Sequence, residues 1–276
     1  MGQMSAHNYT AWFIVPFDKS VVASIVGKGL VPLPNDTTMF PSGFPANQHP
    51  VLFYSAYLAD IKQGPLEIPS LLNAGIRVPC VDQLVDGKTC FSYSVTGFIG
   101  GDNGQIISGL VPGAVGTLEG NTVYPGLFSP ANAPYQDLGN GEFFTEVDNQ
   151  ILPNPLSGPG IAPEAFALRF TKVGQNQTSL VTDRGFKFLL NQPLISNLGL
   201  TCANILYYFN QTFEEPFYCQ GTVDFISEPL NLNTVPSPLA GSYFNQACWS
   251  ASAVSVGGGQ MDCRQAAASL DLTSLL

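Results

Sequence analysis

Charged residues are scarce in this sequence. They make up 11% of its 276 residues, against about 25% in an ordinary soluble domain. The 10 lysines and arginines are outnumbered by 20 acidic residues, and they are scattered singly along the chain. Nucleic acids and anionic membranes require clustered basic side chains. We therefore expect neither of them among the partners of this protein.

Groups that bind metals or activate nucleophiles are also few. The chain has two histidines, His7 and His49, and it lacks Cys-X-X-Cys, His-Glu-X-X-His and Gly-X-Ser-X-Gly motifs. A zinc framework or a catalytic triad would lack its usual groups here. The glycines at 257–259 are not followed by Lys-Ser/Thr, so they do not form a phosphate loop. We expect neither a metal nor a conventional cofactor.

Long hydrophobic runs are absent as well. No apolar stretch reaches the about 18 residues of a membrane span, and residues 1–5 lack the apolar centre of a signal peptide. If the protein is secreted, as the next two features predict, we expect that its signal peptide is missing from this sequence. The oligomeric state stays open.

The sequence does contain six cysteines, an even number. Their spacing favours disulfides between neighbours in the sequence, each closing a short loop. The alternative is six reduced thiols in the core. The predicted pairs are Cys80 with Cys90, Cys202 with Cys219, and Cys248 with Cys263.

Four Asn-X-Ser/Thr triplets predict N-glycosylation, at Asn8, Asn35, Asn176 and Asn210. Glycans at these sites would supply the solubility that charge does not. Taken with the even cysteine count, the triplets predict a protein of the secretory pathway, although single triplets also arise by chance. A family resemblance described below implies a small apolar or conjugated metabolite as the partner.

Most of the chain has the pattern of strands. Over 89–99, Phe91, Tyr93 and Val95 alternate with polar residues, the period of two of a half-buried strand. Glycines and Asn103 at 100–104 predict a hairpin turn. The other expected strands are 50–61, 75–81, 105–111, 165–173, 186–190, 202–213, 221–227 and 242–249.

Two short helices interrupt these strands. Asp18 caps the first, which carries an apolar stripe and ends at Gly29, and the second covers 263–270. Residues 112–163 hold eight prolines and eight glycines, so we expect a long loop or packed lid with at most one short hairpin. We predict one mainly β domain over 1–276, an antiparallel β-barrel.

Inward aromatic residues of such a barrel would enclose an apolar cavity, although plain core packing is the simpler explanation for each of them. Charged residues on apolar strands are candidates for a site, or for structural salt bridges. We predict polar catalytic groups at Arg77, Lys187 and Asp60. The predicted cavity walls, which would bind the substrate, are Tyr54, Tyr57, Tyr93, Phe98 and Trp249.

From Val21 to Glu119 the order of elements resembles the acetoacetate decarboxylase-like β-barrel family. The resemblance lies in a short amphipathic helix, Gly29–Pro34, an apolar strand, Arg77–Pro79, and a strand–turn–strand ending at Gly109–Gly113. That family forms a Schiff base on a lysine just after this turn. Here the positions are Ala114, Val115 and Gly116, so an imine-forming lyase would need a displaced lysine such as Lys187.

In general type the chain also resembles the fungal hetero-Diels-Alderases of tropolone sesquiterpenoid pathways, which are secretory glycoproteins without a conventional cofactor or triad. This resemblance implies a cofactor-independent cyclase of secondary metabolism, which dehydrates a hydroxymethyl tropolone and couples it to a terpene alkene by (hetero-)Diels-Alder cycloaddition in an apolar barrel pocket. The alternatives are a noncatalytic carrier of hydrophobic ligands, an acetoacetate decarboxylase-like lyase, and a secreted surface protein without a small ligand.

Overall fold

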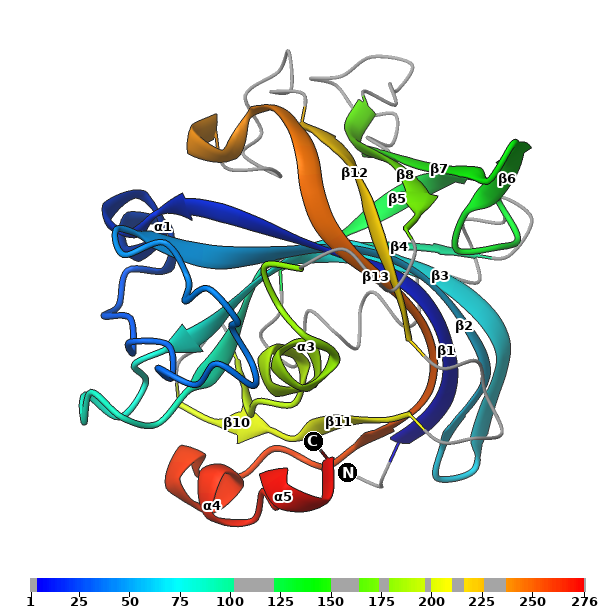
Figure 1. The fold of residues 1–276 in the computed structure, drawn as a ribbon. Coiled ribbons are helices and arrows are strands. Elements are labelled where there is room, and N and C mark those ends of the chain that lie inside the picture. Colours follow the sequence, from blue (N-terminus) through cyan, green and yellow to red (C-terminus); the bar gives the residue numbers. More distant parts are fainter. Residues whose placement is uncertain are drawn as a thin grey trace, which may run out of the picture.

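A computed structural model describes residues 4–101, 122–149, 164–173, 179–196, 200–209, 216–225 and 237–275. Thirteen strands of this part form one sheet (Figure 1). The strands are β1 (Met4–Asp18), β2 (Gln48–Gln63), β3 (Leu66–Val81), β4 (Phe91–Gly101), β5 (Val123–Ser129), β6 (Gln136–Gly139), β7 (Glu142–Asn149), β8 (Glu164–Lys172), β9 (Leu194–Ile195), β10 (Cys202–Ala203), β11 (Ile205–Tyr208), β12 (Phe217–Phe225) and β13 (Gly241–Gly257).

Nine of these strands close into a barrel, in the order β4-β3-β2-β1-β13-β12-β8-β7-β5. Parallel pairing between β5 and β4 closes the ring, and the other neighbours in it are antiparallel. Short β9 and β10 extend the sheet beyond β4, and β11 pairs with β13. The predicted mainly β barrel is confirmed.

The helices are short. They are α1 (Lys19–Val26), α3 (Asp183–Leu190), α4 (Cys263–Ala268) and α5 (Leu272–Leu275), with a 3₁₀ turn, η2, at Ser237–Leu239. Asp18 caps α1 by accepting from Ser20 N, and Gly27 ends α1 in the left-handed conformation. The predicted helices at 18–29 and 263–270 are therefore confirmed, with slightly shorter bounds.

The strand predicted at 186–190 is wrong, because these residues belong to α3. Five residues are too few to separate a strand from a buried helix by their periodicity. The missed signal is Thr182, whose hydroxyl accepts from Gly185 N at 3.2 Å and caps the helix. In Figure 1, α3 lies on the concave side of the curved strands β1, β2 and β13.

The sequence pattern also missed β1 and part of the 112–163 excursion. Neighbouring Trp12, Phe13, Ile14 and Val15 in β1 are all at most 2% exposed, so this strand is buried on both faces and does not alternate. Residues 122–149 form β5, β6 and β7, and two of these are part of the barrel wall. The expectation of at most one short hairpin there is wrong. The strand and turn expected at 102–111 lie outside the described residues.

Phenylalanine side chains pack the interior of the barrel. Ring centroids lie 4.3 Å apart for Phe53 and Phe225, and 5.8 Å apart for Phe13 and Phe170. Ser55 on β2 and Thr145 on β7, which belong to opposite walls, approach within 3.2 Å of each other. The described interior thus contains aromatic and polar side chains that contact one another across the barrel.

Three disulfides link the described cysteines. The predicted Cys80–Cys90 bond is confirmed. The other two predicted pairs are wrong: Cys202 bonds to Cys263, and Cys219 to Cys248. Cys219 lies directly opposite Cys248 in the register of β12 and β13, and Cys202 forms a bridge with Met261 beside Cys263. These two pairs follow from the alignment of neighbouring strands, which brings the cysteines together, and not from short separation along the sequence.

The four predicted glycosylation sites differ in how the structure describes and exposes them. Asn8 is 5% exposed and its amide donates to Ser255 Oγ, so it has no room for a glycan and that prediction is wrong. Asn35 is exposed. Asn176 and Asn210 lie outside the described residues.

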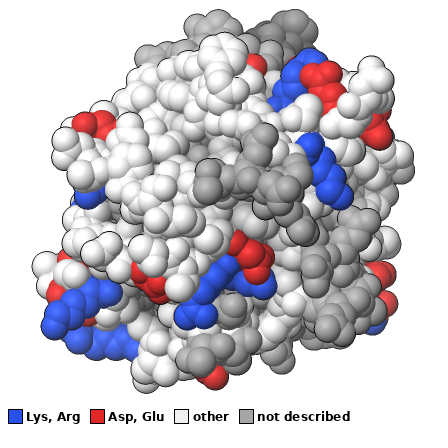
Figure 2. Space-filling view, viewed as in Figure 1, with Lys and Arg blue, Asp and Glu red and all other residues white. Residues whose placement is uncertain are grey.

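The described surface agrees with the low charge content. On the face shown in Figure 2, lysine and arginine side chains occur in small groups, most of them beside acidic side chains, with wide uncharged areas between them. Among the described residues, no helix has the length and apolar character needed to cross a membrane.

Candidate functional site

Four aromatic residues line up across the outer face of the barrel sheet, the side that α3 covers. Successive pairs in the sheet register place them directly opposite one another on β12, β13, β1 and β2, and the same row continues onto Gly75 of β3 and Gly97 of β4. We call these four the aromatic row: Tyr218, Trp249, Trp12 and Tyr54. Directly opposite residues share one face of a sheet.

Glycine at position 75 makes room for the last ring of this row. A Cβ atom there would lie 3.0 Å from Tyr54 Oη and 2.6 Å from the backbone oxygen of Thr96. Tyr54 therefore lies over β3, with its ring centroid 4.4 Å from that of Trp12 and its hydroxyl 3.3 Å from Asn73 Oδ1. The close approach of strand and ring fixes the position of the phenol.

Arg77 brings a positive charge to this face. It follows Gly75 by two residues on β3, and its Cζ lies 5.1 Å from the Tyr54 ring centroid and 5.6 Å from that of Trp12. Its Nη1 donates to Tyr207 Oη at 3.2 Å, whereas its buried Nε has no hydrogen-bond partner. Among the described residues no carboxylate lies within ion-pair distance of it. A partly buried cation without an ion pair is unusual, which makes Arg77 a candidate for a role at a site.

Arg77 and Tyr54 keep their ordinary protonation states, the guanidinium charged and the phenol neutral. Burial acts against the charge of Arg77, but the phenols of Tyr207 and Tyr54 outweigh it, and the pKa of the guanidinium is raised overall. Burial also raises the pKa of Tyr54, with Arg77 acting in the opposite direction. Arg77 therefore stays cationic, and the Tyr54 phenol stays protonated and able to donate.

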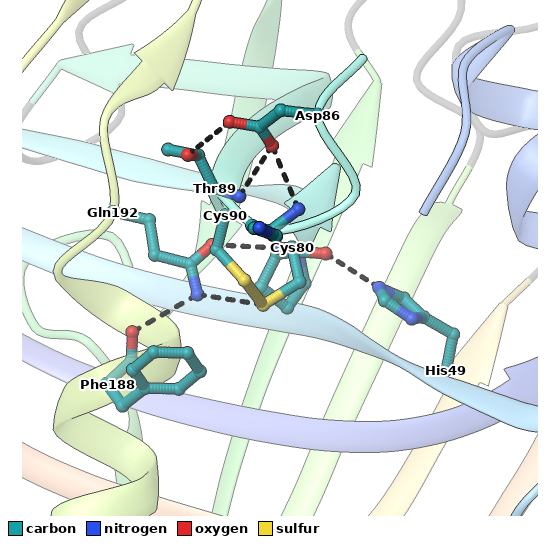
Figure 3. Close-up of a disulfide and its surroundings, with 9 residues drawn as sticks. His49, Cys80, Asp86, Thr89, Cys90, Phe188 and Gln192 are labelled. Atoms are coloured by element: carbon teal, nitrogen blue, oxygen red, sulfur yellow. Dashed lines mark hydrogen bonds between the residues drawn. A yellow bond between two sulfur atoms is a disulfide. The ribbon is translucent and has the colours of Figure 1, made fainter. Parts of the chain in front are cut away.

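Two buried amides after the end of α3 hold this arrangement. Asn191 Oδ1 accepts from Tyr207 N at 2.7 Å, and Asn191 Nδ2 donates to Tyr207 O at 3.4 Å. Gln192 Oε1 accepts from Cys80 N at 2.8 Å, three residues beyond Arg77 on β3 (Figure 3). The end of α3 is thus hydrogen-bonded to Tyr207, which accepts from Arg77, and to β3, the strand that carries Arg77. The sequence does not predict roles for Asn191 and Gln192, because the feature that marks them is burial, which a sequence does not show.

Lys187 lies at the edge of this arrangement. It is on α3, where its Nζ is 2.7 Å from Asp183 Oδ2 and 5.8 Å from the ring centroid of Phe209. The preceding residue, Phe186, stacks on Trp249 with ring centroids 5.5 Å apart. Lys187 is thus already paired with a carboxylate, whereas Arg77 is not.

Asp60, the third predicted catalytic residue, does not join the other two. Its side chain is 69% exposed on β2, and its Oδ2 lies 3.6 Å from His7 Nδ1. An exposed ion pair of this kind is a common surface feature. Its position does not support a role at the same site.

The predicted cavity walls divide between the two faces of the sheet. Tyr54 and Trp249 share the outer face with Arg77. Phe98 lies inside the barrel, where it contacts Phe166, and Tyr57 and Tyr93 pack against that interior cluster. The prediction placed all five around one cavity, because alternation within a strand does not show which face of a curved sheet will be the site.

A second row runs beside the aromatic row on the outer face. It consists of small and polar side chains, Ala251, Thr10, Ala56 and Asn73, in register on β13, β1, β2 and β3. We call it the small-residue row. In the described part of the chain, no group of three or more His, Cys, Asp and Glu side chains comes together to hold a metal ion. The groups that gather here are a cation, phenols, indoles and hydroxyls, which suit the binding and polarisation of an organic oxygen compound.

Comparisons with known proteins bear on the fold. No protein-family model and no curated protein matches the chain. A solved structure of the enduracididine biosynthesis enzyme MppR, in complex with the condensation product of pyruvate and imidazole 4-carboxaldehyde, is 10% identical, with a TM-score of 0.53 over 95% of this chain and 89% of that one. An acetoacetate decarboxylase-like enzyme from Sphingomonas wittichii RW1 is 8% identical, with a TM-score of 0.49 over 95% and 92%. The likeness to MppR shows that the barrel of this chain shares its fold with that enzyme.

Proposed function

We propose that this protein is a cofactor-independent enzyme of secondary metabolism that binds a conjugated carbonyl compound at Arg77. The reaction that we propose is dehydration of a hydroxymethyl tropolone followed by (hetero-)Diels-Alder coupling to an alkene. One observation carries the proposal: Arg77 is a partly buried cation beside the rings of Trp12 and Tyr54, and none of the described carboxylates neutralises it. The predicted reaction is retained, but its site moves from the barrel interior to the outer face.

The groups at Arg77 match the two steps. In the dehydration, Tyr207 gives its phenol proton to the hydroxyl of the CH₂OH group, which leaves as water, and the Tyr207 oxygen takes up the proton of the ring hydroxyl, so a quinone methide forms. Arg77 donates to the Tyr207 oxygen, which leaves the phenol proton of Tyr207 directed away from the guanidinium and free for the leaving hydroxyl. The positive charge of Arg77 stabilises the oxygen that gains electron density.

The cycloaddition needs orientation more than it needs reactive groups. Two σ bonds form between the quinone methide and the alkene, with no leaving group and no proton transfer. Holding the two partners face to face can supply about 7 to 11 kcal/mol. The rings of Trp12 and Tyr54, whose centroids are 4.4 Å apart and whose planes are tilted by 30°, pack against each other and supply apolar surface beside Arg77.

The structural neighbour agrees with a carbonyl ligand on this fold. MppR was solved with a condensation product of pyruvate and an aldehyde, which are both carbonyl compounds. An imine-forming lyase is less well supported here, because Lys187 is held by Asp183 and the lyase position, 114–116, has no lysine. We expect no borohydride-trapped adduct with a β-keto acid.

The test compares two arginines that both lie over aromatic rings. Arg77→Met removes the partly buried cation, whereas Arg169→Met, the matched control, removes an exposed arginine that pairs with Glu142 at 2.9 Å and lies over Phe144. With a hydroxymethyl tropolone and a humulene-type alkene, we expect Arg77→Met to lower the rate of product formation about 10²- to 10³-fold, as for loss of one oxyanion donor. Arg169→Met should keep the wild-type rate.

The outcomes separate the candidate functions. If wild-type protein gives the same yield and stereochemistry as buffer while it binds the tropolone, the carrier function replaces the enzyme. If Arg77→Met turns over like wild type, the proposed site is wrong.

We also propose that the protein passes through the secretory pathway. The three disulfides are compatible with this, because such bonds persist in oxidising compartments. Asn35 is the glycosylation site that the described surface leaves exposed. A glycosidase-sensitive mass at the Asn35 peptide would support the proposal, and an unmodified peptide from a eukaryotic secretory host would argue against that site.

A further inference from the structure

The disulfide between Cys80 and Cys90 differs from the other two disulfides in its exposure. Cys90 is partly exposed, whereas Cys80 and the four cysteines of the other two disulfides are all buried. A thiolate attacks a disulfide only at a sulfur atom that it can reach. Of the three disulfides, Cys80–Cys90 is therefore the one that presents a partly exposed cysteine to an attacking thiol.

A buried amide lies against the other sulfur atom of this bond. Gln192 Nε2 donates to Cys80 Sγ at 3.4 Å and to the backbone oxygen of Phe188 at 3.2 Å (Figure 3). Gln192 Oε1 accepts from Cys80 N at 2.8 Å. Only one orientation of the amide satisfies these partners, because Nε2 can only donate and Oε1 can only accept. An N–H group of Gln192 is therefore directed at Cys80 Sγ.

This contact favours one direction of bond cleavage. In thiol–disulfide exchange, the attacking thiolate bonds to one sulfur, and the other sulfur leaves with the electron pair of the old S–S bond. A buried thiolate is unfavourable unless a cation or a hydrogen-bond donor stabilises it. Cys80 Sγ has the Gln192 donor and is suited to leave, whereas the more exposed Cys90 Sγ is suited to be attacked.

The loop between the two cysteines is also held by bonds that do not involve sulfur. Asp82 Oδ1 accepts from Asp86 N at 3.0 Å. Asp86 Oδ1 accepts from Thr89 N at 2.9 Å, and Asp86 Oδ2 accepts from Thr89 Oγ1 at 2.7 Å (Figure 3). The two cysteines are 10 residues apart, against 29 and 61 in the other disulfides, and a short loop gains the least stability from its crosslink. Opening this bond should therefore leave the fold intact.

We infer that Cys80–Cys90 is a thiol-exchange site, at which a small thiol attacks Cys90 Sγ and the Cys80 thiolate leaves toward Gln192. The attacking thiolate forms a mixed disulfide with Cys90, while the electron pair of the broken S–S bond stays on Cys80 Sγ. A second thiolate then attacks the sulfur of the bound small thiol and releases Cys90 as a thiolate. Two small thiols are oxidised to one disulfide, and the cystine is reduced to two thiols. This inference does not depend on the proposed function at Arg77.

The first test uses the native full chain and reduced glutathione as the small thiol. After a short incubation and an acid quench, free thiols are blocked with N-ethylmaleimide in denaturant, and mass spectrometry of the peptides locates both labels. We expect glutathione on Cys90 and maleimide on Cys80, and we expect these two cysteines to react at least about 10-fold faster than the other four. Glutathione mainly on Cys80, no reaction at either cysteine, or equal reaction of all three disulfides would overturn the inference.

Two neighbouring amides test the role of Gln192. Gln192→Met removes the N–H group that faces Cys80 Sγ, whereas Asn191→Leu, the matched control, removes a buried amide that contacts Tyr207 instead. Both variants loosen the end of α3, and loosening alone would speed up the exchange. We expect Gln192→Met to slow reduction of Cys80–Cys90 about 3- to 10-fold, the worth of one hydrogen bond, and Asn191→Leu to react at the wild-type rate or faster. If Gln192→Met reacts as fast as Asn191→Leu, Gln192 does not stabilise the leaving thiolate and the inferred direction of cleavage is wrong.

Two double variants test whether the bond can open in the folded protein. Cys80→Ser/Cys90→Ser should unfold cooperatively and melt closer to wild type than Cys219→Ser/Cys248→Ser, which removes a buried crosslink across a longer loop. Circular dichroism during heating measures both melting temperatures. If Cys80→Ser/Cys90→Ser is unfolded, or melts below the other pair, the bond is a structural crosslink and the thiol-exchange site is refuted.

Discussion

The two faces of the barrel sheet are both buried, yet they differ in chemistry. The barrel side is packed with phenylalanines such as Phe13, Phe53 and Phe170, and its few polar groups include the Ser55–Thr145 pair. The outer face carries indoles, phenols, hydroxyls and the unneutralised Arg77. Phenylalanine brings only packing to a core, whereas tyrosine and tryptophan add a polar end. From this comparison we expect stability to reside mainly in the barrel side, and we place the proposed function on the outer face.

The largest loss of stability should follow from a substitution that leaves a cavity in the barrel core. Phe170 is 1% exposed and contacts Phe13, Tyr135 and Phe143. Phe170→Ala should lower the free energy of unfolding by about 3 to 5 kcal/mol, because it leaves a cavity. Phe244→Ala, at an exposed phenylalanine, is the control and should change it by less than about 0.5 kcal/mol. If denaturant unfolding shows that Phe170→Ala and Phe244→Ala lose the same free energy of unfolding, the assignment of stability to the barrel side is wrong.

The next effect is a dependence of stability on pH that comes from the barrel side. His49 lies on the face of β2 that also carries Val51 and Phe53, and its Nε2–H donates to Pro79 O at 2.6 Å (Figure 3). Burial lowers its pKa to about 4, with Lys19 acting in the same direction and the Pro79 bond against it. The unfolded chain binds the proton first, so this contribution is complete above about pH 6.5 and is lost as the pH falls toward 4.

The size of that loss follows from the two pKa values. It should reach about 3 kcal/mol in wild type. His49→Gln should remove this part of the slope, while His7→Gln, at the exposed ion pair with Asp60, should keep it. Unfolding in urea at several pH values measures the difference, and parallel curves for wild type and His49→Gln would show that His49 does not titrate in this range.

A smaller loss of stability should follow from a substitution on the outer face, at Gly75 beside Tyr54. Gly75→Ala would put a methyl group 3.0 Å from Tyr54 Oη and 2.6 Å from Thr96 O. We expect a loss of about 1 to 3 kcal/mol from overpacking, together with weaker ligand binding as Tyr54 moves. Gly97→Ala, where the nearest atom would be 3.7 Å away, is the control. If Gly75→Ala binds ligand and unfolds like wild type, then Gly75 does not position Tyr54 for binding.

The smallest effect on stability should be that of the two arginines. Arg169→Met breaks an exposed ion pair with Glu142 and should cost less than about 1 kcal/mol. Arg77→Met should also change the free energy of unfolding by less than about 1 kcal/mol, because no described carboxylate would be left without its partner. Loss of several kcal/mol in Arg77→Met, measured by denaturant unfolding, would make Arg77 a structural residue.

Sequence patterns predicted the barrel, α1, α4 and one disulfide, because these depend on local signals such as the Asp18 cap and the alternation in β4. They missed β1, whose residues are buried on both faces, and α3, whose helix pattern covers too few residues. They also missed the Cys219–Cys248 bond, which depends on register between two strands.

The site was predictable only in part. Arg77 was found because a charge on an apolar strand is unusual, and Tyr54 and Trp249 were found as aromatic residues on strands. Their arrangement as one row follows from the register of four strands, which a single sequence does not contain. The link of Asn191 to Tyr207, which accepts a hydrogen bond from Arg77, depends on burial and on long-range hydrogen bonds that the sequence does not show.

A crystal structure of the protein soaked with tropolone tests the central claim most directly. The account predicts the ligand on the outer face, packed on Trp12 and Tyr54, with an oxygen within hydrogen-bond distance of Arg77. A ligand inside the barrel among Phe53, Phe98 and Phe166, or one bound away from Arg77, would contradict it.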